Sequence, residues 1–162
     1  MKKQKGFSLI ELLIVVAIIL IIAAIAIPNL LRSRMAANEA SAVGSLRTIN
    51  TAEVTFSTTY PTIGFANLAS LGGAASSCAG STYANSTNAC LIDSVLAQAV
   101  GIKSGYNFTA SAGSGTPAVT YSSLAVPTVN GQSGQRAFCS DQSGVIRFNA
   151  GGTACANTDS AL

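Results

Sequence analysis

The chain has 162 residues, of which 49% are hydrophobic and only 9% are charged, and its net charge is +3. Lys2, Lys3 and Lys5 account for that excess, so the rest of the chain is neutral and no basic surface for nucleic acid is expected. Histidine is absent, which removes the commonest general base and the commonest metal ligand and argues against an enzyme.

The first thirty residues contain a long apolar run. From Leu12 to Ile27 every residue is Leu, Ile, Val or Ala, and residues 7–11 extend the run to 21 positions. A helix of this length covers about 31 Å, which matches the hydrocarbon core of a bilayer. The lysines that precede the run place the N-terminus in the cytoplasm and the bulk of the chain across the membrane.

Glu11 separates three interpretations of this run. A secretory signal peptide could be cleaved after Ala24-Ile25-Ala26, and a plain signal anchor would also have a basic start. Neither has a use for Glu11, because a carboxylate costs about 2.5 to 3.5 kcal/mol at the centre of a membrane helix. Cleavage between Gly6 and Phe7 would create an amine four residues before Glu11, on the same helix face. That amine could pair with Glu11 within one chain or between neighbouring chains. The pairing between neighbours would fix the axial stagger of bundled helices, so Glu11 is predicted to set assembly register.

The stretch KGFSLIELLIVVAIIL resembles the class III signal of type IV pilins and pseudopilins, most of all that of type IVa major pilins. The resemblance implies that residues 1–6 are a leader peptide, which a prepilin peptidase removes by cutting between Gly6 and Phe7. It also implies N-methylation of Phe7. Residues 7–28 are then the hydrophobic helix that spans the membrane and later forms the filament core.

Pro28 is predicted to break this helix, because it lacks an amide hydrogen and leaves the Ala24 carbonyl without its usual partner. Many relatives that the stretch resembles carry glycine where this chain has Leu20, and their helix is thought to melt between the two positions on assembly.

Residues 29–60 keep helical character but become amphipathic. Val43, Leu46, Ile49 and Phe56 form one stripe, which is predicted to pack into the core of a domain. The helix is expected to end before Pro61. The charged residues of this half are expected to be solvated or to pair with neighbouring subunits: Arg32, Arg34, Glu39, Arg47 and Glu53.

Residues 61–105 are predicted to be a long loop, rich in Gly, Ser, Ala and Asn, with a short helix over Leu91–Val100. Residues 106–162 contain four segments with strand character, which predict an antiparallel four-stranded sheet packed on the helix in an α+β fold. These segments are Tyr106–Ser111, Ala118–Val126, Arg136–Asp141 and Val145–Asn149.

The four cysteines lie beyond the apolar run, in a region expected outside the cytoplasm, so disulfides are favoured. A four-thiolate zinc site is the alternative, but it normally needs close C-x-x-C pairs. Three disulfide pairings are possible. The resemblance to pilins favours Cys78–Cys90 in the loop and Cys139–Cys155 in a C-terminal disulfide loop.

No catalytic constellation, metal site or cofactor site is predicted. Outside the leader the only lysine is Lys103, so a serine nucleophile would have little choice of base. The aspartates are scattered, and a calcium site near Asp141 is a weak alternative.

The sequence therefore predicts a structural subunit of a type IV pilus, used for adhesion or motility. It would wait in the bacterial inner membrane, be processed, and polymerise with copies of itself into an extracellular surface filament. Its partners would be the membrane, the prepilin peptidase, and an inner-membrane assembly platform with an ATPase motor. A pseudopilin of a type II secretion system or a minor pilin is the nearest alternative. An adhesin or DNA receptor, an electron conductor and a secreted domain are less favoured.

Overall fold

The computed structural model describes residues 7–73, 78, 84–98 and 100–162, so the proposed leader lies outside the described residues. The chain divides after Arg34 into two compact units, residues 1–34 and residues 35–162. Helix α1 (Leu9–Thr59) begins in the first unit and ends in the second. It ends before Pro61, as predicted, and the Tyr60 amide makes its last helical bond to the Phe56 carbonyl at 2.8 Å.

Pro28 does not break α1, which contradicts the prediction of a helix break at this position. The helix is continuous from Leu9 to Thr59 with Pro28 inside it. Proline removes one backbone hydrogen bond, but the many bonds on either side of that position hold the helix together.

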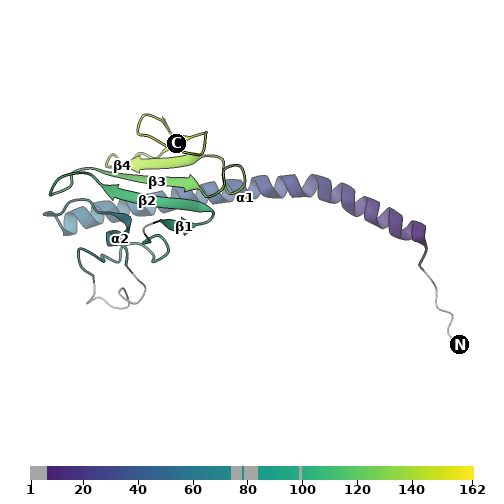
Figure 1. Ribbon diagram of the computed structural model, residues 1–162, viewed down its shortest axis with the longest axis horizontal. Coiled ribbons are helices and arrows are strands. Elements are labelled where there is room, and N and C mark those ends of the chain that lie inside the picture. The colour runs from purple at the N-terminus through teal and green to yellow at the C-terminus, as the bar shows by residue number, and fades with distance from the viewer. Residues whose placement is uncertain (1–6, 74–77, 79–83, 99) are drawn as a thin grey trace. The chain divides into compact units, whose positions relative to one another are not determined.

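The second unit contains an antiparallel meander of six strands, so the prediction of four strands was wrong in number (Figure 1). Each strand pairs with the next one along the chain. The strands are β1 (Gly101–Lys103), β2 (Tyr106–Ala112), β3 (Tyr121–Pro127), β4 (Ala137–Asp141), β5 (Arg147–Asn149) and β6 (Ser160–Ala161).

The two strands that were not predicted lie at the edges of the sheet. β1 pairs Ile102 with Asn107 of β2, and β6 pairs Ser160 with Phe148 of β5. Both strands are only two or three residues long, which is too short to show an alternating pattern in the sequence.

The core lies between the second half of α1 and one face of the sheet. The predicted stripe is confirmed, since Leu46, Ile49 and Phe56 are fully buried and Val43 nearly so. Aromatic side chains fill the sheet side of this core, among them Tyr106, Phe108 and Phe138. The fold is therefore the predicted α+β arrangement of a long helix on an antiparallel sheet.

Strand β4 is buried along its whole length. Phe138 packs in the core with residues of α1, so by strand alternation Cys139 points to the opposite face. There a disulfide joins Cys139 to Cys155 and brings the C-terminal segment over the outer face of β4. The second disulfide joins Cys78 to Cys90, so both bonds follow the pairing that the resemblance implied.

The connection between α1 and β1 differs from its prediction. Its helix is α2 (Leu68–Leu71), where the Asn67 side chain caps the N-terminus by accepting the Ser70 amide at 2.9 Å. The predicted helix over Leu91–Val100 is a series of turns in the residues described there. Asp93 begins that turn by accepting the amides of Val95 and Leu96.

Candidate functional site

The N-terminal turn of α1 is the first candidate site, and it contains the two predicted residues Phe7 and Glu11. Phe7 precedes the helix and is exposed, whereas Gly6 lies outside the described residues. The Ser8 amide donates a hydrogen bond to Glu11 Oε2 at 2.9 Å, and the Leu12 amide bonds to the Ser8 carbonyl at 3.3 Å. Ser8 is therefore the residue that caps α1, and Glu11 reaches back to its backbone.

This contact is one half of a capping box, and the prediction for Glu11 had not included it. The signal was present, because Ser8-Leu9-Ile10-Glu11 fits the S-x-x-E pattern that begins many helices. The carboxylate satisfies an amide that the helix leaves without a partner, and its charge is favourable beside the positive end of the helix dipole. The Ser8 bond uses one carboxylate oxygen, so the other can accept a hydrogen bond from an amine.

The apolar surface that follows Glu11 is the second candidate feature of the first unit. Its large side chains are all exposed, from Leu12 to Leu31. An apolar surface of this extent is unfavourable in water, at about 1.5 to 3 kcal/mol for each large side chain. By length and composition α1 is able to cross a membrane.

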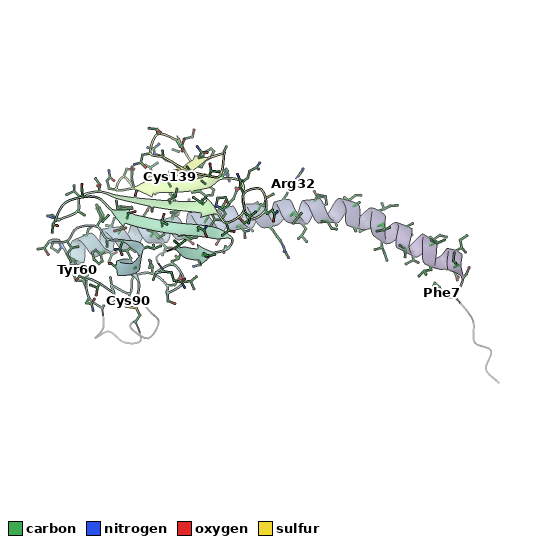
Figure 2. The ribbon with its side chains drawn as sticks, in the orientation of Figure 1. Phe7, Arg32, Tyr60, Cys90 and Cys139 are labelled. Carbon is green, nitrogen blue, oxygen red and sulfur yellow. A yellow bond between two sulfur atoms is a disulfide. The ribbon has the colours of Figure 1, made fainter. Side chains whose placement is uncertain are left out.

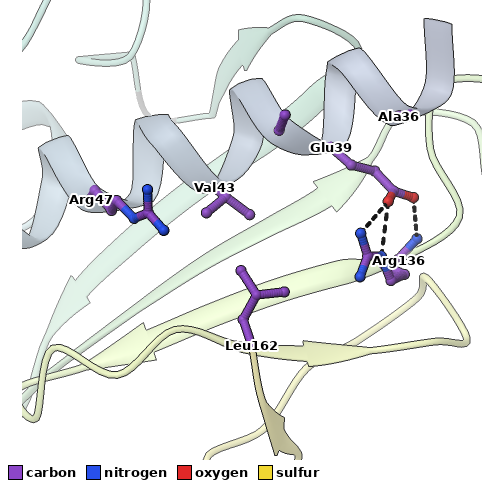
Figure 3. Close-up of a pocket in the computed structure, with 7 residues that line it drawn as sticks. Ala36, Glu39, Val43, Arg47, Arg136 and Leu162 are labelled. Carbon is purple, nitrogen blue, oxygen red and sulfur yellow. Dashed lines mark hydrogen bonds and ion pairs between the residues drawn. The ribbon is translucent and has the colours of Figure 1, made fainter. Parts of the chain in front are cut away.

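Glu39 forms a polar contact between α1 and the segment that leads into β4, although it was predicted to be solvated or to pair with another subunit. Its carboxylate accepts the amides of Gln135 and Arg136 at 2.9 and 3.2 Å, and the Arg136 guanidinium at 2.8 Å (Figure 3). Burial by itself would raise the pKa of Glu39, but these hydrogen bonds and the Arg136 charge hold the pKa below its ordinary value.

The Arg136 guanidinium also lies over two aromatic rings, at 5.3 Å from the centre of Phe138 and 5.4 Å from that of Phe148. Beside this contact a groove of about 350 Å³ runs between α1 and the C-terminal Leu162 (Figure 3). Because Arg136 and Glu39 satisfy each other, the groove offers no free acid–base pair for catalysis.

Glu53 is fully buried in the second unit, so its predicted exposure was also wrong. Its Oε2 accepts the Ala66 amide at 3.0 Å, and its Oε1 has no hydrogen-bond partner among the described residues. Burial raises the pKa of Glu53 to about 7, and the Ala66 hydrogen bond offsets only part of that effect. The contact joins the C-terminal part of α1 to the segment that follows the helix.

Other charged residues of the second unit take part in local contacts. Asp141 accepts the amide and the hydroxyl of Ser143 within the turn between β4 and β5. Lys103 pairs with Asp93 at 2.8 Å on the surface. Within residues 7–73, 78, 84–98 and 100–162 no group of three or more Cys, Asp or Glu side chains could hold a metal ion.

Comparison with known proteins supports the importance of the N-terminal segment. A family described as the prokaryotic N-terminal methylation motif matches residues 1–27. The chain is 64% identical over 39 residues to the type IV wide pilus major component PilA4 of Thermus thermophilus. It is 46% identical over 54 residues to the type IV major pilin protein PilA of Myxococcus xanthus.

These similarities cover 24% and 33% of this chain, and they span 30% and 24% of the length of the two relatives. No solved structure matches the chain. The family model, which matches residues 1–27, falls on the apolar half of α1 and the turn that caps it.

Proposed function

We propose that this chain is a type IV pilin and the structural subunit of a type IV pilus, on the basis of the similarities of its N-terminal segment. In this proposal the chain waits in the inner membrane, a prepilin peptidase cuts between Gly6 and Phe7, and Phe7 is methylated. An assembly platform with an ATPase motor then moves the subunit into an extracellular filament of identical copies. Both relatives are described as major components of a pilus, which favours a major pilin over a pseudopilin.

The observation that carries the proposal is Glu11, the one acidic residue before an unbroken apolar surface that is exposed along its length. Such a surface is about equally stable in lipid and in a bundle of identical helices, whereas transfer to water is strongly unfavourable. Assembly can therefore exchange lipid contacts directly for protein contacts. Within the bundle, Glu11 accepts a hydrogen bond from the Phe7 amine of a neighbouring subunit while Ser8 occupies its other oxygen.

The pair Glu11→Gln and Glu11→Ala tests the charge separately from the helix cap. Glutamine keeps the capping hydrogen bond but removes the negative charge, whereas alanine removes both. We expect both variants to be inserted and cleaved, and both to be at least about tenfold depleted from sheared surface fibres, in line with a lost buried charge pair. Immunoblots of sheared and membrane fractions measure this. Normal fibres from Glu11→Gln would show that only the cap matters.

The N-terminal residue of the sheared material provides an independent test. Fibre protein that begins at methylated Phe7 supports the proposal. Protein that begins at Ile27 would instead identify a secreted domain, and protein that keeps the leader lysines would also reject the proposal. A processed chain that stays in the cell envelope and is missing from sheared fibres would point to a pseudopilin.

A further inference from the structure

Arg32 and Arg34 are two charged residues of the first unit for which the described part of the chain holds no ion-pair partner. Both are exposed on α1 directly after the apolar surface, and neither has a carboxylate within 4.0 Å among the described residues. Figure 2 shows the Arg32 side chain extended away from the helix. The next acidic residue along the chain is Glu39, and its carboxylate is already occupied by Arg136.

The distance between Glu11 and this arginine pair matches a bilayer. Leu12–Leu31 contains 20 residues and no charged side chain. In a continuous helix these residues cover about 30 Å, the thickness of the hydrocarbon core. When Glu11 lies at the cytoplasmic boundary of that core, Arg32 and Arg34 therefore lie just beyond the opposite boundary, at the level of the lipid phosphates.

We propose that Arg32 and Arg34 bind the phosphate groups of anionic phospholipids in the outer leaflet of the inner membrane and thereby set the depth of the waiting subunit. This inference rests on the proposed membrane-bound state of a pilin. A guanidinium suits this role because its parallel N–H groups match two phosphate oxygens and its charge persists at every physiological pH. The attraction to an anionic leaflet adds to this contact.

The helix geometry indicates that each arginine binds its own lipid. Residues two positions apart point about 200° apart around an α-helix, since each residue turns it by about 100°. Arg32 and Arg34 therefore cannot close on one phosphate from the same side. They place two positive charges on opposite sides of the helix at nearly the same height, which suits two separate headgroups.

Removal of the leader makes this pair more important. Lys2, Lys3 and Lys5 leave with the leader, and Arg32 and Arg34 are then the only lysine or arginine residues before Arg47. Their lipid contacts hold the processed subunit at one depth until the assembly machinery withdraws it. Extraction must break these contacts, so lipids of the outer leaflet oppose premature release.

The experiment compares lipid selectivity of the full chain with that of Arg32→Gln/Arg34→Gln in phosphatidylcholine vesicles. Trace spin-labelled phosphatidylglycerol or phosphatidylcholine is added, and electron paramagnetic resonance measures the fraction of each lipid held at the protein surface. The double variant should reduce the preference for phosphatidylglycerol about two- to fivefold. Each single variant should account for part of that loss, and 0.5 M salt should reduce the difference between the proteins.

Arg47→Gln is the matched control, since it removes an exposed arginine of the same helix far from the apolar boundary, and it should leave the preference unchanged. The leader lysines are present in all these proteins, so their effect on the lipid preference is the same in each. An unchanged preference in the double variant overturns the inference. Flotation of the chain with the vesicles is measured separately, so a chain that fails to insert contradicts the proposed function, whereas one that inserts without selectivity contradicts only the arginine contacts.

Discussion

Two glutamates of α1 show how far the surroundings of a single residue can change its chemistry. Glu39 receives three donors and a positive charge, which lower its pKa, whereas Glu53 receives one backbone amide in an apolar setting, which raises its pKa. Both residues lie on the stripe that contains Val43, Leu46 and Phe56, at the helical spacing of the core. That spacing indicates that both residues are buried. They were expected to be exposed because charged side chains usually lie on protein surfaces.

Glu53 is expected to make the second unit less stable as pH rises. Its pKa is about 7 in the folded chain against an ordinary value of 4.5, so the folded state holds a proton that the unfolded state releases between these values. The free energy of unfolding should therefore fall from pH 5 to pH 8, by roughly 3 kcal/mol as an upper bound. Glu53→Gln should abolish this decrease and be the more stable protein at pH 8. Urea unfolding in detergent, followed by near-ultraviolet circular dichroism, measures the difference.

Glu39→Gln is the matched control, because the stability that Glu39 contributes depends on pH in the opposite direction. The folded pKa of Glu39 is lowered, so its stabilising effect is complete above the ordinary pKa of 4.5 and is lost as pH falls through the lowered value. At pH 7 this variant should lose about 1 to 3 kcal/mol, because the Arg136 guanidinium and two amides lose a charged acceptor. If the free energy of unfolding depends on pH in the same way in the wild type and in Glu53→Gln, the raised pKa of Glu53 is not the cause of the decrease.

At the scale of elements, Gly64 joins the connecting segment after α1 to Ala118, in the loop that precedes β3. The Phe65 amide bonds to the Ala118 carbonyl at 3.0 Å, and the Ala118 amide bonds to the Ile63 carbonyl at 2.8 Å. Gly64 lies between these bonds with φ at +83°, and an added Cβ would lie 2.1 Å from the Ala118 oxygen. Both the backbone conformation and the space therefore require glycine here.

Gly64→Ala is expected to destabilise the second unit by about 3 kcal/mol or more, through about 1 kcal/mol of left-handed strain and the remainder from separating two bonded segments. Gly131→Ala isolates the strain, since φ is +80° there but nothing lies within 4 Å of the added atom, and it should cost only about 1 kcal/mol. Denaturant midpoints measure both variants. Equal losses of stability in the two variants would show that the close approach to Ala118 does not contribute to the cost of Gly64→Ala.

At the scale of the whole molecule, the charges on the two sides of the apolar run are expected to decide its orientation. Three lysines precede the apolar run and two arginines follow it closely, so the positive-inside bias is small. Replacing Lys2, Lys3 and Lys5 with glutamine should reverse the bias and place a substantial fraction of the chains with residues 35–162 in the cytoplasm. Protease access in spheroplasts measures this fraction. Adding Arg32→Gln/Arg34→Gln should restore part of the correct orientation, and an unchanged orientation in the triple variant would reject the charge argument.

The sequence by itself determined the parts that depend on neighbouring residues. The apolar run, the end of α1 before Pro61, the core stripe at Leu46 and Ile49, and the central strands all follow from periodicity and turn chemistry over a few residues. Only the tertiary structure decided which groups meet: Glu39 with Arg136, Glu53 with Ala66, and the short edge strands β1 and β6 with their neighbours. Glu39 and Arg136 are 97 residues apart, and the edge strands are too short to show a pattern. The stability of these contacts comes from burial and pairing, which a local pattern does not contain.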